Sequence, residues 1–225
     1  MKKYLILIII LFSSNVLAHI NHYKKYNKIE MDIFRNGELI GYNYYFFTRK
    51  GDETTVANQI KFSVKILGAT IFQVEGYGEE KYFKDQLISF NSKTLQNDKE
   101  KFVNLFFDKD KNKFNIKGSS YSGEASIDNI VGNWWNHKIL QTKSQISPIS
   151  GSIKKQVVTF VGKEKIEQYG QTFEVDHFKL KSKDTSLPKD KLLDFDIWFD
   201  KKNSTIIRVS YSRMGNWEYR LKDFE

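Results

Sequence analysis

Apolar and polar residues alternate along much of this chain. In segment 60–66, Ile, Phe, Val and Ile occupy every second position, with Lys or Ser between them. The same period of two recurs at 103–107, 195–199 and 207–211. Residues two apart lie on one face of a strand, so each run buries one face and exposes the other. The alternation therefore predicts a protein built mainly from β-strands.

Turn-forming residues separate the alternating runs. Asn36 and Gly37 lie between the predicted strands 29–35 and 38–48, which is typical of a two-residue type I′ hairpin. Strands joined by such short turns are neighbours in the sheet and antiparallel. Further turn-forming clusters occur at 51–52, 97–98, 110–112, 169–171, 201–203 and 214–216.

Several of the predicted strands are long, notably 38–48, 54–67 and 69–84. Long antiparallel strands twist and coil, and Gly76 and Gly78 lie where such a sheet would bend, although each glycine also fits a simple strand end. We therefore expect an all-β fold with minor α content, in which a long twisted antiparallel sheet is curled into a barrel or half-barrel.

Helix-forming patterns are scarce. A short helix is predicted near 128–140, with Asn133 as its N-cap. Segment 141–151 contains Pro148 and several serines, which predicts a loop and a boundary between the N-terminal and C-terminal halves of the sheet. The sequence contains no repeat of fixed period, and residues 19–225 are expected to form a single β domain.

The first eighteen residues have the pattern of a secretory signal peptide. Lysines precede an apolar run at 5–12, and Ala18 suits cleavage immediately after it. The run is shorter than the roughly 20 residues of a membrane-spanning helix, with an uncleaved anchor as the alternative. No cysteine lies near the cut, so lipid attachment there is excluded. We expect a signal peptide at 1–18 and a periplasmic or secreted product.

Composition excludes several functional classes. The chain has no cysteine, which rules out disulfides, thiol enzymes and Cys-ligated zinc. Its formal charge is +9, but most lysines are interspersed with acidic residues, so we expect no nucleic-acid partner. Such a surface permits weak contact with an anionic membrane. No cofactor is expected, because no phosphate-binding glycine loop or nucleophile elbow is present.

Two groups of polar residues are weak candidates for chemistry. Cleavage after Ala18 would leave His19 at the N-terminus, where its amine and imidazole, with His22, could chelate copper. His177 follows Asp176, but adjacent strand residues point to opposite faces, so the two should not form an acid–base pair.

Three carboxylates at 194, 196 and 200 share one predicted strand face. Paired carboxylates serve glycoside hydrolysis, and oxygen clusters bind hard cations. Lysines flank all three, which instead favours a charge-balanced face exposed to solvent. We therefore name no catalytic residue.

Aromatic residues provide the candidate ligand-binding set. Trp134, Trp135 and Tyr121, together with Phe62 and Val64, could line the concave face of a curled sheet and contact an apolar ligand. The alternative is that these side chains complete the core.

Short sequences across the chain resemble a bacterial family of exported proteins that is itself a domain of unknown function. They are NGELIG at 36–41, EEKYF at 79–83, NWW at 133–135, DIWFD at 196–200 and GNWEYRL at 215–221, and the resemblance spans 29–221. The family implies an uncharacterised periplasmic β protein and supplies no site residues. More loosely, the chain is similar to periplasmic carriers of the lipoprotein-chaperone kind, whose curled half-barrel holds acyl chains.

Three hypotheses for function follow. The first is an exported binding module that holds a lipid or other amphiphile in the concavity of the sheet. The second is an enzyme or metal-binding protein that acts on cell-envelope polymers through the carboxylate face or the N-terminal histidines. The third is a structural or interaction protein without a small ligand.

Overall fold

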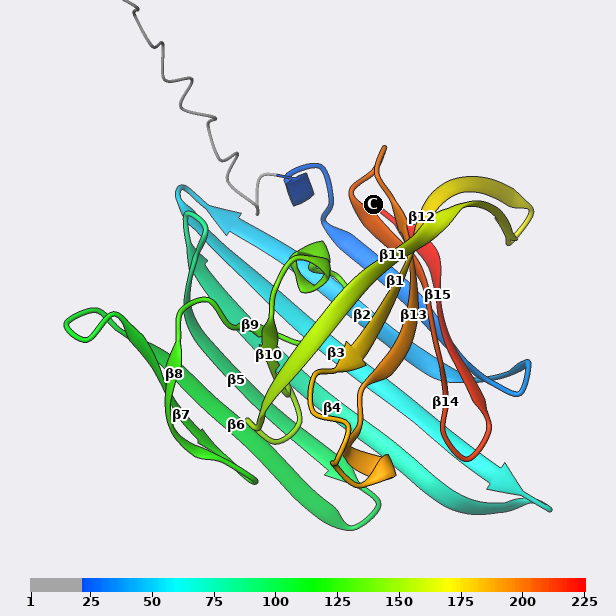
Figure 1. The fold of residues 1–225 in the computed structure, drawn as a ribbon, viewed down its shortest axis with the longest axis horizontal. Helices are drawn as coiled ribbons and strands as arrows, with labels where there is room; N and C mark the ends of the chain where they lie inside the picture. The colour runs from blue at the N-terminus through cyan, green and yellow to red at the C-terminus, as the bar shows by residue number, and fades with distance from the viewer. Residues whose placement is uncertain (1–21) are drawn as a thin grey trace, which may run out of the picture.

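The computed structural model describes residues 22–225, so the predicted signal peptide at 1–18 and His19 lie outside the described residues (Figure 1). One sheet of 15 strands forms the fold. The strands are β1 (Lys28–Arg35), β2 (Glu38–Lys50), β3 (Glu53–Ile66), β4 (Ala69–Phe83), β5 (Gln86–Gln96), β6 (Lys99–Asp108), β7 (Lys113–Gly118), β8 (Ser122–Ser126), β9 (Ile130–Val131), β10 (Ser144–Ile146), β11 (Ile153–Gln168), β12 (Gln171–Ser182), β13 (Asp194–Asp200), β14 (Thr205–Ser212) and β15 (Asn216–Phe224). The 3-10 turns η2 (His137–Leu140) and η3 (Lys189–Lys191) accompany them.

The order of the strands in the sheet follows the chain. Neighbours run from β8 back to β1, then from β15 back to β9, and every pair is antiparallel except β9 with β10. The pairing of β1 with β15, which sets Ile33 opposite Tyr219, joins the two halves. Strands β8 and β9 form the two edges and do not pair. The sheet is thus curled but open, which confirms the prediction of an all-β, barrel-like fold.

The alternation of residues assigns the two faces of the sheet. Asn43, Tyr45 and Phe47 of β2 are buried on the inner face, and the register sets Tyr45 opposite Asn58 of β3. Phe62 continues this inner row and is buried as the pattern predicts. The apolar interior extends over both halves of the sheet.

The inner face is filled by the chain itself. Residues 130–146, hereafter the plug, contain β9, η2 and β10. Trp135 is only 1% exposed, and its ring lies 5.0 Å from the ring of Tyr23 and 5.4 Å from that of Phe47. The helix predicted near 128–140 is reduced to the 3-10 turn η2. Its N-cap is Asn136, so the prediction of Asn133 as the cap was wrong.

Asn133 is instead part of a hydrogen-bonded cluster around the buried carboxyl group of Glu80. The Asn133 amide and the Trp135 indole donate to Glu80 Oε1 at 2.7 and 2.9 Å. The Tyr82 hydroxyl donates to Oε2. Buried polar groups are costly unless they are hydrogen-bonded, so these contacts fix the plug against β4.

The β11–β12 hairpin is strongly bent (Figure 1). Hydrogen bonds join its turn to strands β14, β15 and β1. The Gln168 amide donates to the carbonyl oxygens of Ile207 and Leu221 at 3.2 and 2.6 Å. The Tyr169 hydroxyl donates to Asp32 Oδ2 at 2.7 Å. These bonds hold the end of a long hairpin that would otherwise project from the sheet.

Replacing Glu80 with glutamine is expected to remove a pH dependence of stability. Burial raises the pKa of the Glu80 carboxyl above its ordinary value of 4.5, against the opposing hydrogen bonds from Tyr82, Trp135 and Asn133. Above pH 4.5 the folded protein then binds more protons than the unfolded chain, so stability falls as the pH rises toward the folded-state pKa. Glu80→Gln keeps the acceptor oxygen and should flatten this fall, as measured by thermal unfolding from pH 4.5 upward.

Glu79 provides the matched control, because it is the adjacent carboxylate and pairs with Lys81 at 3.2 Å. Glu79→Gln should leave the pH dependence of the thermal midpoint as it is in the wild type. An identical slope in wild type and Glu80→Gln would contradict the assignment of this titration to Glu80.

Candidate functional site

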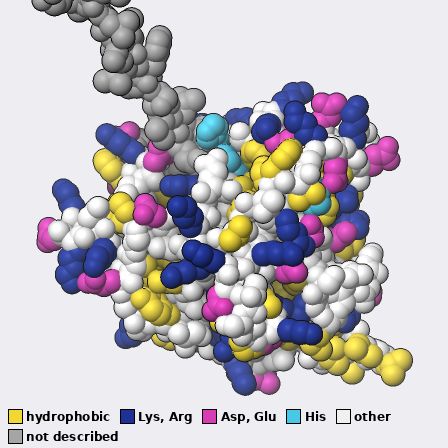
Figure 2. All heavy atoms as spheres, in the orientation of Figure 1, with side chains coloured by type: hydrophobic (Ala, Val, Ile, Leu, Met, Phe, Trp, Pro, Cys, Tyr) yellow, Lys and Arg dark blue, Asp and Glu magenta, His cyan; other side chains and the backbone are white. Residues whose placement is uncertain are grey.

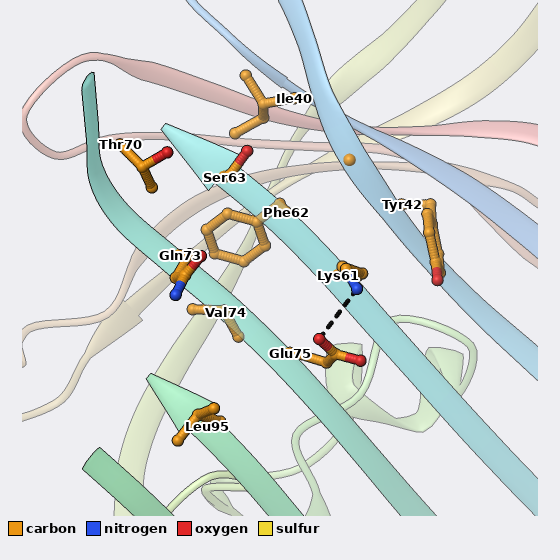
Figure 3. A pocket seen from close by; sticks show the side chains of 11 residues that line it. Ile40, Tyr42, Lys61, Phe62, Ser63, Thr70, Gln73, Val74, Glu75 and Leu95 are labelled. Carbon is orange, nitrogen blue, oxygen red and sulfur yellow. Dashed lines mark ion pairs between the residues drawn. The ribbon is translucent and has the colours of Figure 1, made fainter. Parts of the chain in front are cut away.

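The candidate site is a half-open groove of about 440 Å³ (Figure 3). It lies where β2, β3, β4 and β5 run side by side. Its apolar wall contains Ile40, Phe62, Val74 and Leu95, and its polar wall contains Tyr42, Lys61, Ser63, Thr70, Gln73 and Glu75. The groove therefore offers apolar contact and charge within a small space.

The polar wall is organised by one ion pair. Lys61 Nζ lies 3.0 Å from Glu75 Oε2 across β3 and β4 (Figure 3). The hydrogen bond to Glu75 raises the pKa of the Lys61 ammonium. Both side chains are more than half exposed, so the pair contributes little to stability but is accessible to a polar group of a ligand.

A glycine permits the close approach of strands beneath the groove. A Cβ atom on Gly41 would lie 2.0 Å from the carbonyl oxygen of Lys61 and 2.5 Å from Cα of Phe62. No other residue type fits at that distance. Gly41 thus lets β2 approach β3 closely at the point where it is opposite Phe62.

A smaller hollow of about 190 Å³ adjoins the groove. The two share Ile40 and Ser63, and the smaller one also contacts Val64, Lys65 and Leu39. Two members of the candidate ligand-binding set, Phe62 and Val64, therefore contribute to neighbouring hollows at one end of the sheet.

The other three candidates lie elsewhere. Trp135 is in the core of the plug. Trp134 is half-buried, with its ring 5.1 Å from that of Phe195. The hydroxyl group of Tyr121 donates to the carbonyl oxygen of Glu124 at 2.7 Å. The structure does not bring the five candidates together into one site, and their role in binding stays a prediction.

The comparison with protein families decides the affiliation of the chain. Residues 31–222 match the family described as domain of unknown function DUF6134. The chain belongs to the DUF6134 family. The sequence-based identification of a family of unknown function is thereby confirmed.

Solved structures resemble this DUF6134 chain in fold alone. A β-barrel-like protein of the DUF1849 family from Brucella abortus superposes with a TM-score of 0.59 at 9% identity, over 88% of this chain and 96% of that one. A protein with a YmcC-like fold from Bacteroides fragilis gives 0.36 at 11% identity, over 88% and 94%. Only the first superposition is close enough to support the fold. The search of curated proteins finds no match.

Histidines do not assemble a metal site in the described part of the DUF6134 domain. No group of three or more His, Cys, Asp or Glu side chains is placed to hold a metal ion among residues 22–225. The ring of His22 lies 5.3 Å from that of His137, whose Nδ1 is 2.6 Å from the Tyr23 hydroxyl. His19, the other predicted copper ligand, lies outside the described residues, so the copper site stays a prediction.

His177 has two carboxylate partners that the sequence did not reveal. Its Nδ1 lies 2.7 Å from Glu164 Oε1, and its Nε2 lies 2.9 Å from Asp196 Oδ1. The ring stacks on Trp198, with centroids 4.6 Å apart. Asp176 points to the opposite face, as expected, and pairs with Lys201 at 2.5 Å. A β-bulge between Phe160 and Gly162 shifts the register that aligns Glu164, which no local pattern predicts.

The partners of this histidine are themselves occupied. The Trp198 indole donates to Glu164 at 2.9 Å and holds the pKa of that carboxyl below its usual range. Partial burial disfavours the charged Asp196, yet bonds from Lys179 and His177 keep its pKa low. Both carboxylates therefore remain anions within an ion-pair network on the outer face.

The three predicted carboxylates have separate roles. Asp194 and Asp196 share Lys179, each at 2.7 Å. Asp200 instead accepts the backbone N–H of Lys202 and the Asn203 amide, both at 2.8 Å, and so caps its own turn. The arrangement gives no pair of free carboxyl groups facing a cleft, which a glycoside hydrolase needs.

Gly41→Ala is expected to lower the free energy of unfolding by about 3 kcal/mol, because the added methyl group overlaps the backbone of β3. Chemical denaturation measures the change. Gly162→Ala is the control, since no atom lies within 4 Å of the Cβ position there. We expect that variant to stay within about 1 kcal/mol of wild type. Equal stabilities of the two variants would show that β2 and β3 do not approach as described.

Proposed function

We propose that the protein is exported and acts in the cell envelope as a non-enzymatic binding protein for an amphiphile, such as a lipid with a polar head group. The groove between β2 and β5 carries the proposal. Its lining places the exposed apolar side chain of Leu95, which is opposite Glu75 in the sheet, beside the ion pair of Lys61 and Glu75. A ligand with a hydrocarbon part and a charged or polar part would pack against the apolar lining residues and bind the polar ones.

The size of the groove is suited to part of a small ligand. Its volume of about 440 Å³ falls within the range of roughly 300–1,000 Å³ in which small-molecule sites occur. It is half-open, so a longer acyl chain would extend along the surface. The concavity of the sheet is a poorer candidate, because the plug fills it with Trp135 and Ile139.

Export is supported by the sequence pattern of residues 1–18, with its basic start and apolar run. The absence of cysteine near Ala18 favours a freely diffusing product over a lipid-anchored one. Within residues 22–225, no helix has the length and apolar character to cross a membrane.

The groove is tested with a dansyl-labelled fatty acid, whose fluorescence rises on binding. Leu95→Ser combined with Lys61→Gln removes one contact from each wall, and both side chains are exposed enough for the fold to tolerate the change. We expect the double variant to bind about tenfold more weakly, since loss of a Leu contact costs about 1.5 kcal/mol.

Phe106→Ser is the matched control for this experiment. Phe106 is an exposed apolar residue of β6 that does not line the groove. The control should bind the probe as the wild type does. A wild type that does not bind the probe, together with native mass spectra free of co-purified lipid, would refute the proposal.

A second candidate function, an interaction protein without a small ligand, is favoured by the filled interior. The plug occupies the face that a carrier would leave open, and the Glu80 cluster fixes it there. This candidate and the amphiphile proposal differ in the probe experiment, because an interaction protein gives no saturable binding of the fatty acid.

A further inference from the structure

The turn between β3 and β4 projects from the molecule as an apolar tip. Leu67 is fully exposed, and Ile66 and Ile71 beside it are each about half exposed, at 49% and 47%. Figure 2 shows hydrophobic side chains standing out from the rest of the surface at the lower right, where β3 ends in Figure 1. Exposed apolar residues are ordinary singly, but a projecting group of them marks an interaction site.

The backbone of this tip is strained by its own side chain. Leu67 has a φ of +50° and is followed by Gly68 at +82°, the left-handed pair of a type I′ turn. Asn36 and Gly37 form the same turn at +52° and +84° with residues that tolerate it. A leucine in that conformation is unusual, and strained residues of this kind cluster at functional sites.

A second apolar turn lies at the same end of the sheet. Met214, in the turn between β14 and β15, is 85% exposed and has a φ of +50°. Its carbonyl oxygen accepts from the Arg35 guanidinium at 2.5 Å, which places it beside the turn between β1 and β2. The small hollow that contacts Arg35, Leu39 and Lys65 connects that turn to the end of β3. Leu39 is itself more than half exposed.

Cations surround these apolar turns. Lys65 and Arg35 lie beside the two hairpins, and Arg213 precedes Met214. Burial lowers the pKa of the Lys154 ammonium, and the nearby charges of Lys191 and Arg213 lower it further, with Asp190 opposing them. The end of the sheet therefore combines apolar tips with a group of cations, hereafter the collar, which Glu38 and Asp190 accompany.

We propose that this end of the sheet docks onto an anionic lipid bilayer, with Leu67 and Met214 inserted at the boundary between head groups and acyl chains. The collar of Lys and Arg side chains then contacts the lipid phosphates. Apolar side chains at the tip with cations just behind them match the layered chemistry of a membrane surface. Leu67 and Met214 project from two separate turns, and a fluid bilayer accommodates separate projections.

Vesicle flotation tests the docking. The purified protein is mixed with vesicles of phosphatidylcholine containing phosphatidylglycerol, or of phosphatidylcholine alone. We expect flotation with the anionic vesicles, weaker flotation with the neutral ones, and a loss of binding as salt screens the lysines. Lys65→Gln should weaken binding to the anionic vesicles only.

Leu67→Asn separates docking from folding. Asparagine tolerates a positive φ, so the thermal midpoint should stay the same or rise. Binding to anionic vesicles should fall about tenfold, because the inserted side chain is lost. The matched control is Phe83→Asn, since Phe83 is 47% exposed at the opposite end of β4 and lies outside the proposed surface.

Equal flotation of Leu67→Asn and wild type would overturn the proposal, as would an equal loss in Phe83→Asn or the absence of binding to anionic vesicles. The result of the flotation experiment does not depend on ligand binding in the groove between β2 and β5. Leu67→Asn should keep wild-type affinity for the fatty acid probe, whereas the groove variant with Leu95→Ser and Lys61→Gln should keep most of its flotation.

Discussion

The hydrogen bonds that Asn133 and Trp135 donate to the buried carboxyl group of Glu80 hold the interior of this molecule together. A curled sheet that does not close has an apolar face that must be covered. Here the cover is the plug, and its attachment to β4 is polar. Among the ion pairs of the described residues none involves Glu80, so the carboxyl group depends on these donors and on Tyr82. The position of the plug in turn leaves the groove between β2 and β5 and the hairpin turns as accessible features.

The strands and turns were predictable because they depend on local sequence. The predicted strand at 38–48 corresponds to β2, Glu38–Lys50, and the Asn36-Gly37 turn has the expected left-handed backbone. The pairing of β1 with β15 was not predicted, since residues at opposite ends of the chain carry no mutual signal in a single sequence. The alternation fixes which face a residue occupies and leaves the choice of partner strands open.

The candidate site was harder to predict than the fold. Glu80 has the same parity as the buried Val74 and Tyr82, but a carboxylate is ordinarily exposed to solvent, so its burial was not predicted. Aromatic content did not distinguish Trp135 in the core from Phe62 beside a groove. That difference depends on the path of the plug, which long-range packing determines. The partners of His177 depended on a bulge in β11, a feature with no clear sequence pattern here.

The pairing of β1 with β15 also determines when the sheet can be completed during folding. Strand β1 pairs with β2 on one side, but on its other side it pairs with β15, which lies at the far end of the chain. Next to this pairing, Lys28 and Glu225 exchange backbone hydrogen bonds at 3.0 and 3.1 Å. Contacts between distant parts of a chain close slowly, because a long loop must first be ordered. A polypeptide emerging from the ribosome therefore retains an incomplete sheet until residues 216–224 have been synthesised.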